Sequence, residues 1–282
     1  MGEVVFAACL SHAPGMTGLA DRADPRRVER LQAGLTSLRA ALERSRPDAI
    51  VGVSNDHFTN FFLSNLPAFA IGSASTYACP ADAELSDLLG IESHEQPGHG
   101  ELGHDLLAHL LSSGFDPALV AGSFGLDENF AVPLHLLAPA SPPPLVPVLV
   151  NAVQPPCPSL RRCWDLGLAL GLWLQQQTIV DRIALIGTGG LSHWVGVPRS
   201  GDIDVEFDHR VLERFGSGDA QDLVTMTQAE LDAAGNGANE LRTWLAVAAA
   251  VDSVPFQTLA YEPVAEWSTG IAITQAILGG AP

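Results

Sequence analysis

The segment from Arg182 to His193 reads RIALIGTGGLSH, and its pattern indicates how the chain folds. Arg182 to Gly187 is a short, mostly apolar run, which is typical of a strand buried inside a sheet. Thr188 to Gly190 follows at once, and its glycines let the backbone turn tightly and approach a ligand closely. His193 ends the segment. The pattern therefore predicts a buried strand that leads into a turn carrying a reactive side chain.

Two earlier segments have the same design. Val4 to Leu10 is an apolar run followed by His12, and Asp48 to Ser54 is another followed by His57. In open α/β sheets, ligands bind outside the carboxyl ends of the strands. Three histidines at three such ends can therefore converge on one site. Spacing alone does not establish this, because a single histidine after a strand is more often a structural residue than a ligand.

Helical patterns alternate with these strands. Asp24 and Pro25 have the residue types of a helix start, and that helix extends to about Arg46. Further strands are expected at 66–73, 118–122, 145–152 and 270–278, and further helices at 100–113, 158–176, 202–215, 227–234 and 239–251. The alternation predicts an α/β fold over residues 1–282, a single domain with a central mostly parallel or mixed sheet flanked by helices. The turn SPPP at 141–144 is too short to separate two domains.

Composition excludes several classes of function. The net charge of -18 argues against nucleic acid and against anionic membrane surfaces as partners. No apolar run approaches the roughly 18 residues of a membrane span, and the first residues lack the basic region of a secretion signal. The four cysteines show no paired spacing, which predicts a reducing, cytoplasmic location. All 14 basic residues other than histidine are arginine, which excludes Schiff-base chemistry and a phosphate-binding lysine.

A glutamate completes a candidate metal site. Glu240 follows the glycine-containing loop 235–239 and stands at the start of a predicted helix, from which its side chain can point into a pocket. Two histidines and one carboxylate on one face of an octahedron leave three positions open, an arrangement that suits Fe(II). The helix dipole alone, worth about 0.3–1 kcal/mol, also explains a glutamate in the first turn. The residues themselves leave both interpretations open.

The motifs taken together resemble the class III extradiol ring-cleavage dioxygenases, the family of the protocatechuate 4,5-dioxygenase β subunit and 2,3-dihydroxyphenylpropionate 1,2-dioxygenase. They occur in order along the chain as SHAP (11–14), NDHF (55–58), VPL (132–134), GGLSH (189–193), NELRTW (239–244) and PVAEW (263–267). The resemblance implies that His12, His57 and Glu240 bind Fe(II), or Mn(II) as the alternative. It implies a second-sphere acid/base at His193. It also implies a small aromatic substrate, O2 as co-substrate, and a homo-oligomer, a dimer or larger.

One position departs from the family pattern. Just before the VPL motif many relatives carry Asp-His-Gly, in which the histidine is a second acid/base, whereas this chain has Asp127-Glu128-Asn129. Glu128 either takes over the acid role, or signals chemistry other than ordinary catechol cleavage, or is a neutral substitution. We expect Trp194 and Asn129 to contact the substrate, although Trp194 also fits a purely structural role in the core.

These observations lead to one main expectation and two alternatives. The main expectation is an Fe(II)-dependent enzyme that opens a catechol-type ring next to its two hydroxyls and inserts both atoms of O2. The first alternative, motivated by Glu128, is related oxygen chemistry on an aminophenol or a biosynthetic aromatic intermediate. The second is a non-catalytic metal-binding subunit, against which the presence of His12, His57, His193 and Glu240 argues.

Overall fold

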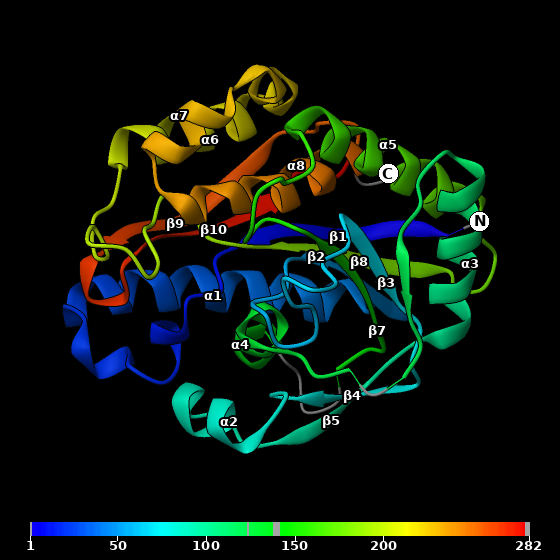
Figure 1. Cartoon of the computed structure of the whole chain (residues 1–282), viewed down its shortest axis with the longest axis horizontal. Helices are drawn as coiled ribbons and strands as arrows, with labels where there is room; N and C mark the ends of the chain where they lie inside the picture. The colour runs from blue at the N-terminus through cyan, green and yellow to red at the C-terminus, as the bar shows by residue number, and fades with distance from the viewer. Residues whose placement is uncertain (1, 123, 138–141, 280–282) are drawn as a thin grey trace.

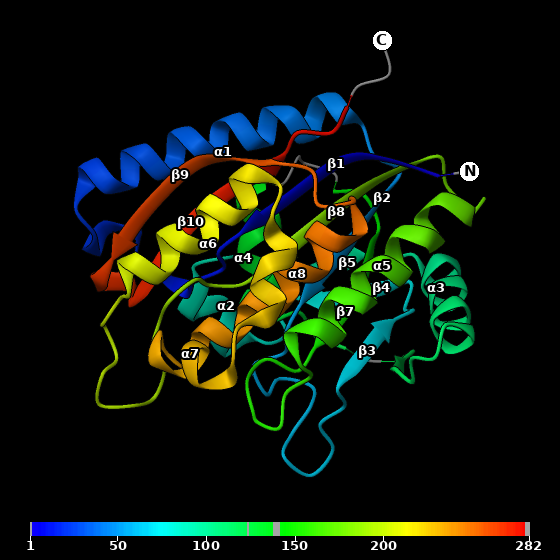
Figure 2. The same cartoon turned by 90° about the horizontal axis from the view of Figure 1, so that it is seen from above.

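One mixed sheet of eight strands runs through the middle of the protein (Figures 1 and 2). The computed structural model describes residues 2–122, 124–137 and 142–279. The strands of this sheet are β1 (Glu3–Leu10), β2 (Ala49–Ser54), β3 (Phe69–Gly72), β6 (Ala118–Val120), β7 (Leu145–Val150), β8 (Arg182–Thr188), β9 (Phe256–Val264) and β10 (Thr269–Ala276). They lie in the order β6-β3-β7-β2-β8-β1-β10-β9, which confirms the predicted α/β domain with a mixed sheet.

The centre of the sheet is parallel. Strands β7, β2, β8 and β1 run in one direction, while β3, β10 and β9 join them through antiparallel pairs. Every residue of β2 and β7 is buried, as expected for strands that are covered on both faces. Leu10 at the end of β1 is aligned with Thr188 at the end of β8. The loops that follow β1, β2 and β8 therefore leave the same edge of the sheet.

Helices cover both faces of the sheet (Figure 1). Helices α1 (Pro25–Ser45) and α4 (Glu128–Leu137) pack on one face, and α3 (Gly100–Ser112), α5 (Leu160–Gln176) and α8 (Leu241–Ala250) pack on the other. The other helices are α2 (Ala83–Leu89), α6 (Val205–Ser217) and α7 (Gln228–Ala233). Short 3-10 turns lie at Pro14–Met16, Ala20–Arg22, Ala220–Thr225, Asn236–Glu240 and Ala265–Trp267. None of the helices within the described residues has the length and hydropathy to cross a membrane.

Most predicted elements are present within a few residues of their expected bounds. The helix expected at 239–251 begins instead with the 3-10 turn Asn236–Glu240 and continues as α8. Strand β9, helix α2 and the hairpin of β4 (Thr76–Cys79) and β5 (His94–Pro97) were not predicted. The turn predicted at 141–144 begins at Ser141, which lies outside the described residues.

Helix α8 is buried along its whole length, and this fixes the residue at its start, Glu240. Close packing of α5 against α8 contributes to that burial. A Cβ atom at Gly167 of α5 would lie 2.2 Å from the carbonyl oxygen of Ala246 in α8, so the two helices can approach this closely only with glycine there. The core thus holds the start of α8 next to the sheet edge from which the loops after β1, β2 and β8 leave.

The loop that follows β8 is tied to helix α6 by a buried carboxylate. Asp208 accepts hydrogen bonds from the backbone N–H of Ser192 at 2.7 Å and from the hydroxyl of Tyr261 at 2.7 Å. In return, the Ser192 hydroxyl accepts from the backbone N–H of Asp204 at 2.8 Å. Burial raises the pKa of Asp208 to about 6, although its hydrogen bonds act in the opposite direction. The residue just before His193 is therefore anchored from its backbone and from its side chain.

Replacing Asp208 with Asn should make stability less sensitive to pH between about 4 and 6. A carboxyl whose pKa is higher in the folded than in the unfolded protein binds its proton more tightly when folded, so the wild type loses stability as pH rises through this window. A shift from 3.8 to about 6 corresponds to at most about 3 kcal/mol. Urea unfolding from pH 4 to pH 7 measures the difference, and the exposed Asp87→Asn variant is the control. Parallel stability curves for wild type and Asp208→Asn would contradict this account.

Candidate metal centre

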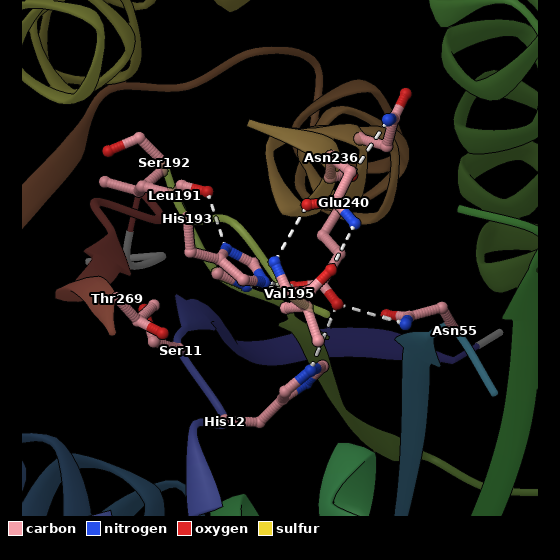
Figure 3. Close-up of polar contacts among 12 residues, drawn as sticks. Ser11, His12, Asn55, Leu191, Ser192, His193, Val195, Asn236, Glu240 and Thr269 are labelled. Atoms are coloured by element: carbon pink, nitrogen blue, oxygen red, sulfur yellow. Dashed lines mark hydrogen bonds and ion pairs between the residues drawn. The ribbon is translucent and has the colours of Figure 1, made fainter. Parts of the chain in front are cut away.

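Three side chains from distant parts of the chain meet above the carboxyl edge of the parallel strands. His12 comes from the loop after β1, His57 from the loop after β2, and Glu240 from the start of α8. Oε1 of Glu240 lies 3.4 Å from Nε2 of His12 and 3.3 Å from Nε2 of His57. Figure 3 shows the His12 and Glu240 side chains pointing toward one another. The three donor atoms lie within 4.8 Å of one another, a spacing at which one metal ion can bind all three.

The hydrogen bonds around the two histidines leave the correct nitrogen available for a metal. Thr188 Oγ1 lies 2.6 Å from the hydroxyl of Ser54 and 2.8 Å from the carbonyl oxygen of Asn129, so its one proton goes to one of these two oxygens. The Thr188 oxygen is then left to accept from Nδ1 of His12 at 3.2 Å. Nδ1 of His57 lies 3.1 Å from Oδ1 of Asp127, a carboxylate that can only accept. When a metal displaces the proton from Nε2 and Nδ1 stays protonated in both rings, each Nε2 would direct a lone pair toward the side on which Glu240 lies. Such outer partners are typical of metal-binding histidines.

Glu240 is a buried carboxylate that a cation would stabilise. It accepts hydrogen bonds from the backbone N–H of Gly190 and, at 3.1 Å, from Nδ2 of Asn55. Burial by itself would raise the pKa of the Glu240 carboxyl, but the neighbouring His12 and His57 outweigh burial and hold that pKa well below its usual range. Two imidazoles and an ionised carboxylate form a donor set that suits Fe(II). The residues therefore fit a mononuclear metal.

Acidic neighbours make the His57 ring a favourable place for positive charge. Burial would lower the pKa of His57, yet the carboxylates of Asp127 and Glu128 overcome that effect and raise it well above its ordinary value. His57, Asp127 and Glu128 form a second group of potential ligands. The two carboxylates of this group face Nδ1 of His57, on the opposite side of the ring from Glu240. The oxygens of Asp127 already accept from the backbone N–H groups of His57 and Asn129, each at 2.8 Å, which favours a supporting role for Asp127.

His193 lies beside this group without joining it. Its Nδ1 lies 3.1 Å from the carbonyl oxygen of Leu191, and its Nε2 is 3.9 Å from Oε2 of Glu240 (Figure 3). Burial lowers the pKa of His193. The loop before Glu240 has to contain a glycine here, because a Cβ at Gly237 would lie 2.0 Å from Nε2 of His193.

A cavity of about 280 Å³ opens over the three candidate ligands and His193. Small-molecule sites are typically about 300–1,000 Å³, so this volume suits a compact substrate. Glu128 and Trp194 also line the cavity, together with Trp267 and Thr269.

Asn129 is the exception among the expected site residues. Its side chain donates to the carbonyl oxygen of Asn55 at 2.5 Å and accepts from the backbone N–H of Phe130 at 2.6 Å. It does not line the cavity. The expected substrate contact is therefore replaced by a structural role, since Asn129 links the loop after β2 to the start of α4.

Several supporting residues were not singled out from the sequence. Asn55 and Asp127 lie within the quoted motifs NDHF and Asp127-Glu128-Asn129, so their position next to a candidate site was the available signal. Trp267 lay within the PVAEW motif. Asp208 gave no signal, because an aspartate inside an amphipathic helix is ordinarily exposed.

Comparisons with known proteins agree with this geometry. The family model described as "Catalytic LigB subunit of aromatic ring-opening dioxygenase" matches residues 6–272. A protein named 2,3-dihydroxyphenylpropionate/2,3-dihydroxicinnamic acid 1,2-dioxygenase from Rhodococcus globerulus is 26% identical, with 96% of this chain and 97% of the relative covered. Its namesake from Mycolicibacterium paratuberculosis is 28% identical, with 95% and 97% covered.

A solved structure shares the fold. The crystal structure of an uncharacterized Escherichia coli K12 protein matches with a TM-score of 0.53 and 17% identity, covering 96% of this chain and 99% of the other. At that identity the likeness concerns architecture alone. The family model, in contrast, spans nearly the whole chain and includes every residue of the candidate centre. This chain belongs to the family of catalytic LigB subunits of aromatic ring-opening dioxygenases.

Proposed function

We propose that this enzyme is an Fe(II)-dependent extradiol dioxygenase that opens a catechol-type ring with O2. The observation that carries the proposal is the convergence of His12, His57 and Glu240 beneath a cavity that a third histidine, His193, also lines. The names of the relatives support a catechol as the substrate class. Mn(II) is the alternative metal, because the same donor types accept it.

The protein's own side chains would hold the metal, orient the substrate ring and exchange protons with the substrate. Bound Fe(II) would supply a redox-active Lewis acid at which the catechol and O2 meet. His12, His57 and Glu240 would hold it from the protein side. The cavity side stays open, and its indole and hydroxyl walls, which include Trp194 and Thr269, would orient the ring and exclude bulk water.

His193 is the proposed acid/base. If Nδ1 donates to the Leu191 carbonyl, Nε2 is unprotonated and can accept a proton from a catechol hydroxyl in the cavity. The protonated ring would then return that proton later in the reaction. A second acid/base role for Glu128 is one of the three interpretations that the sequence leaves open. If Glu128 had that role, its loss would slow the cleavage of every catechol equally.

Two further expectations about the protein remain proposals. The four cysteines are free, which supports a reducing compartment such as the cytoplasm. A homo-oligomer, a dimer or larger, is expected from the family resemblance, and sedimentation of the purified protein would test it.

His57→Ala should abolish stoichiometric iron binding after anaerobic reconstitution with Fe(II). The variant removes one of three ligands and leaves Glu240 with fewer positive neighbours. His104→Ala is the matched control, because His104 is an exposed histidine on α3. Elemental analysis after gel filtration measures iron, and Mn(II) loading can be compared in parallel. Equal iron in both variants would remove His57 from the metal site.

His193→Ala should retain iron and lose most turnover, by roughly 10²–10⁴-fold as is usual when a general acid/base is removed. Oxygen uptake with a panel of catechols and aminophenols measures turnover, and product analysis separates the two substrate classes. Unchanged turnover with iron retained would show that His193 takes no part in proton transfer. A wild-type enzyme that binds iron and consumes no O2 with any of these compounds would refute the proposed function itself.

A further inference from the structure

Part of the cavity wall is made of residues that are neither candidate metal ligands nor the candidate acid/base His193. This wall contains the indole rings of Trp194 and Trp267, the apolar side chains of Pro14 and Val195, and the hydroxyl groups of Ser200 and Thr269. Its charged member is Glu128, the first residue of α4. A substituent on a ring held at the metal would meet this wall, so the wall selects among substituted catechols.

The Glu128 carboxylate is available for a ligand. It accepts no hydrogen bond within the described residues, and its Oε1 lies 3.6 Å from Nδ1 of His57, a separation that allows charge attraction but is beyond hydrogen-bonding distance. The hydrogen bond to that nitrogen comes from Asp127 at 3.1 Å, so the task of orienting the ring falls to Asp127. Glu128 is partly exposed and faces the cavity. Its carboxylate can therefore contact a molecule in the cavity.

The arginine next to the cavity wall already contacts other side chains. The chain has no lysine, and the arginine that adjoins the cavity wall in sequence is Arg199, next to Ser200. Its guanidinium lies 4.1 Å from the centre of the Trp194 ring, and its Nε donates to Asp202 at 2.8 Å. An anionic substituent that reached Glu128 would be repelled by its carboxylate. A cationic substituent at the same place would meet an attractive carboxylate.

We propose that this enzyme selects catechols whose ring substituent carries a positive charge, such as a protonated alkylamine, and that Glu128 recognises that charge. The inference rests on the proposed function and deepens it by naming a substrate class. It also separates this enzyme from the relatives named for 2,3-dihydroxyphenylpropionate, whose side chain ends in a carboxylate. Glu128 then acts through its charge and not by transferring a proton.

A series of catechols with matched side chains tests the proposal on the Fe(II)-loaded wild type. The side chain would end in an ammonium, a methyl or a carboxylate group, with each compound made as the 3-substituted and the 4-substituted isomer. Oxygen uptake gives kcat/KM for each. We expect the ammonium compound to exceed the methyl compound by roughly tenfold, as for a partly buried ion pair, and the carboxylate compound to be the poorest. A preference for the carboxylate or no preference at all would overturn the inference and leave the proposed function intact. Failure of every catechol would refute both.

Variants of Glu128 separate recognition of charge from proton transfer. Glu128→Gln keeps the shape and removes the charge, so the ratio of kcat/KM for the ammonium compound to that for the methyl compound should fall about tenfold, to near one. Glu128→Asp should retain part of that ratio. An equal loss on both compounds, with the ratio unchanged, would identify proton transfer and overturn the inference. Arg199→Gln is the control, and it should leave the activity on the carboxylate compound unchanged. If Arg199→Gln lost activity on the carboxylate compound alone, Arg199 and not Glu128 would be the residue that recognises the substituent.

Discussion

The buried carboxylate of Glu240 is the constraint on which the rest of the structure depends. A charge removed from water has to be paired with opposite charge and hydrogen-bonded. Here the partners are His12 and His57 at 3.3–3.4 Å and the donors Asn55 and Gly190. Those partners come from the loops after β1, β2 and β8, so the three strands have to end side by side. The parallel centre of the sheet meets this requirement, and the fully buried helix α8 holds the carboxylate above it.

A second ring of contacts gives each site residue its orientation. Thr188 and Asp127 hold the far nitrogens of the two histidines, and Asp208 holds the loop that carries His193. The site is therefore organised by the protein before any ligand arrives, which is how enzymes avoid reorganisation costs during reaction. Glu128 differs from these residues, because its carboxylate faces the cavity and supports no neighbour by a hydrogen bond within the described chain. That difference is the physical basis for assigning it to the substrate.

The sequence predicted the central strands of the sheet better than its edge strand β9. Continuous apolar runs identified β1, β2 and β8, and the motifs after them supplied two candidate ligands, His12 and His57, and the candidate acid/base His193. β9 was missed because its residues are largely polar or half-buried and it contains Pro263, features of an edge strand that periodicity detects poorly. Asn129 was expected to face the substrate, but no pattern shows that its amide is taken by the backbone of Asn55. The convergence of the ligands likewise depends on long-range packing that spacing alone does not encode.

The most direct test of the account is a crystal structure of the protein loaded anaerobically with Fe(II). We predict one metal ion bound by Nε2 of His12, Nε2 of His57 and a carboxylate oxygen of Glu240, at roughly 2.0–2.2 Å, as is usual for such ligands. His193 should lie beside the ion without binding it. A metal on the other side of the His57 ring, held by Asp127 and Glu128, would contradict the account, as would density for iron at neither place.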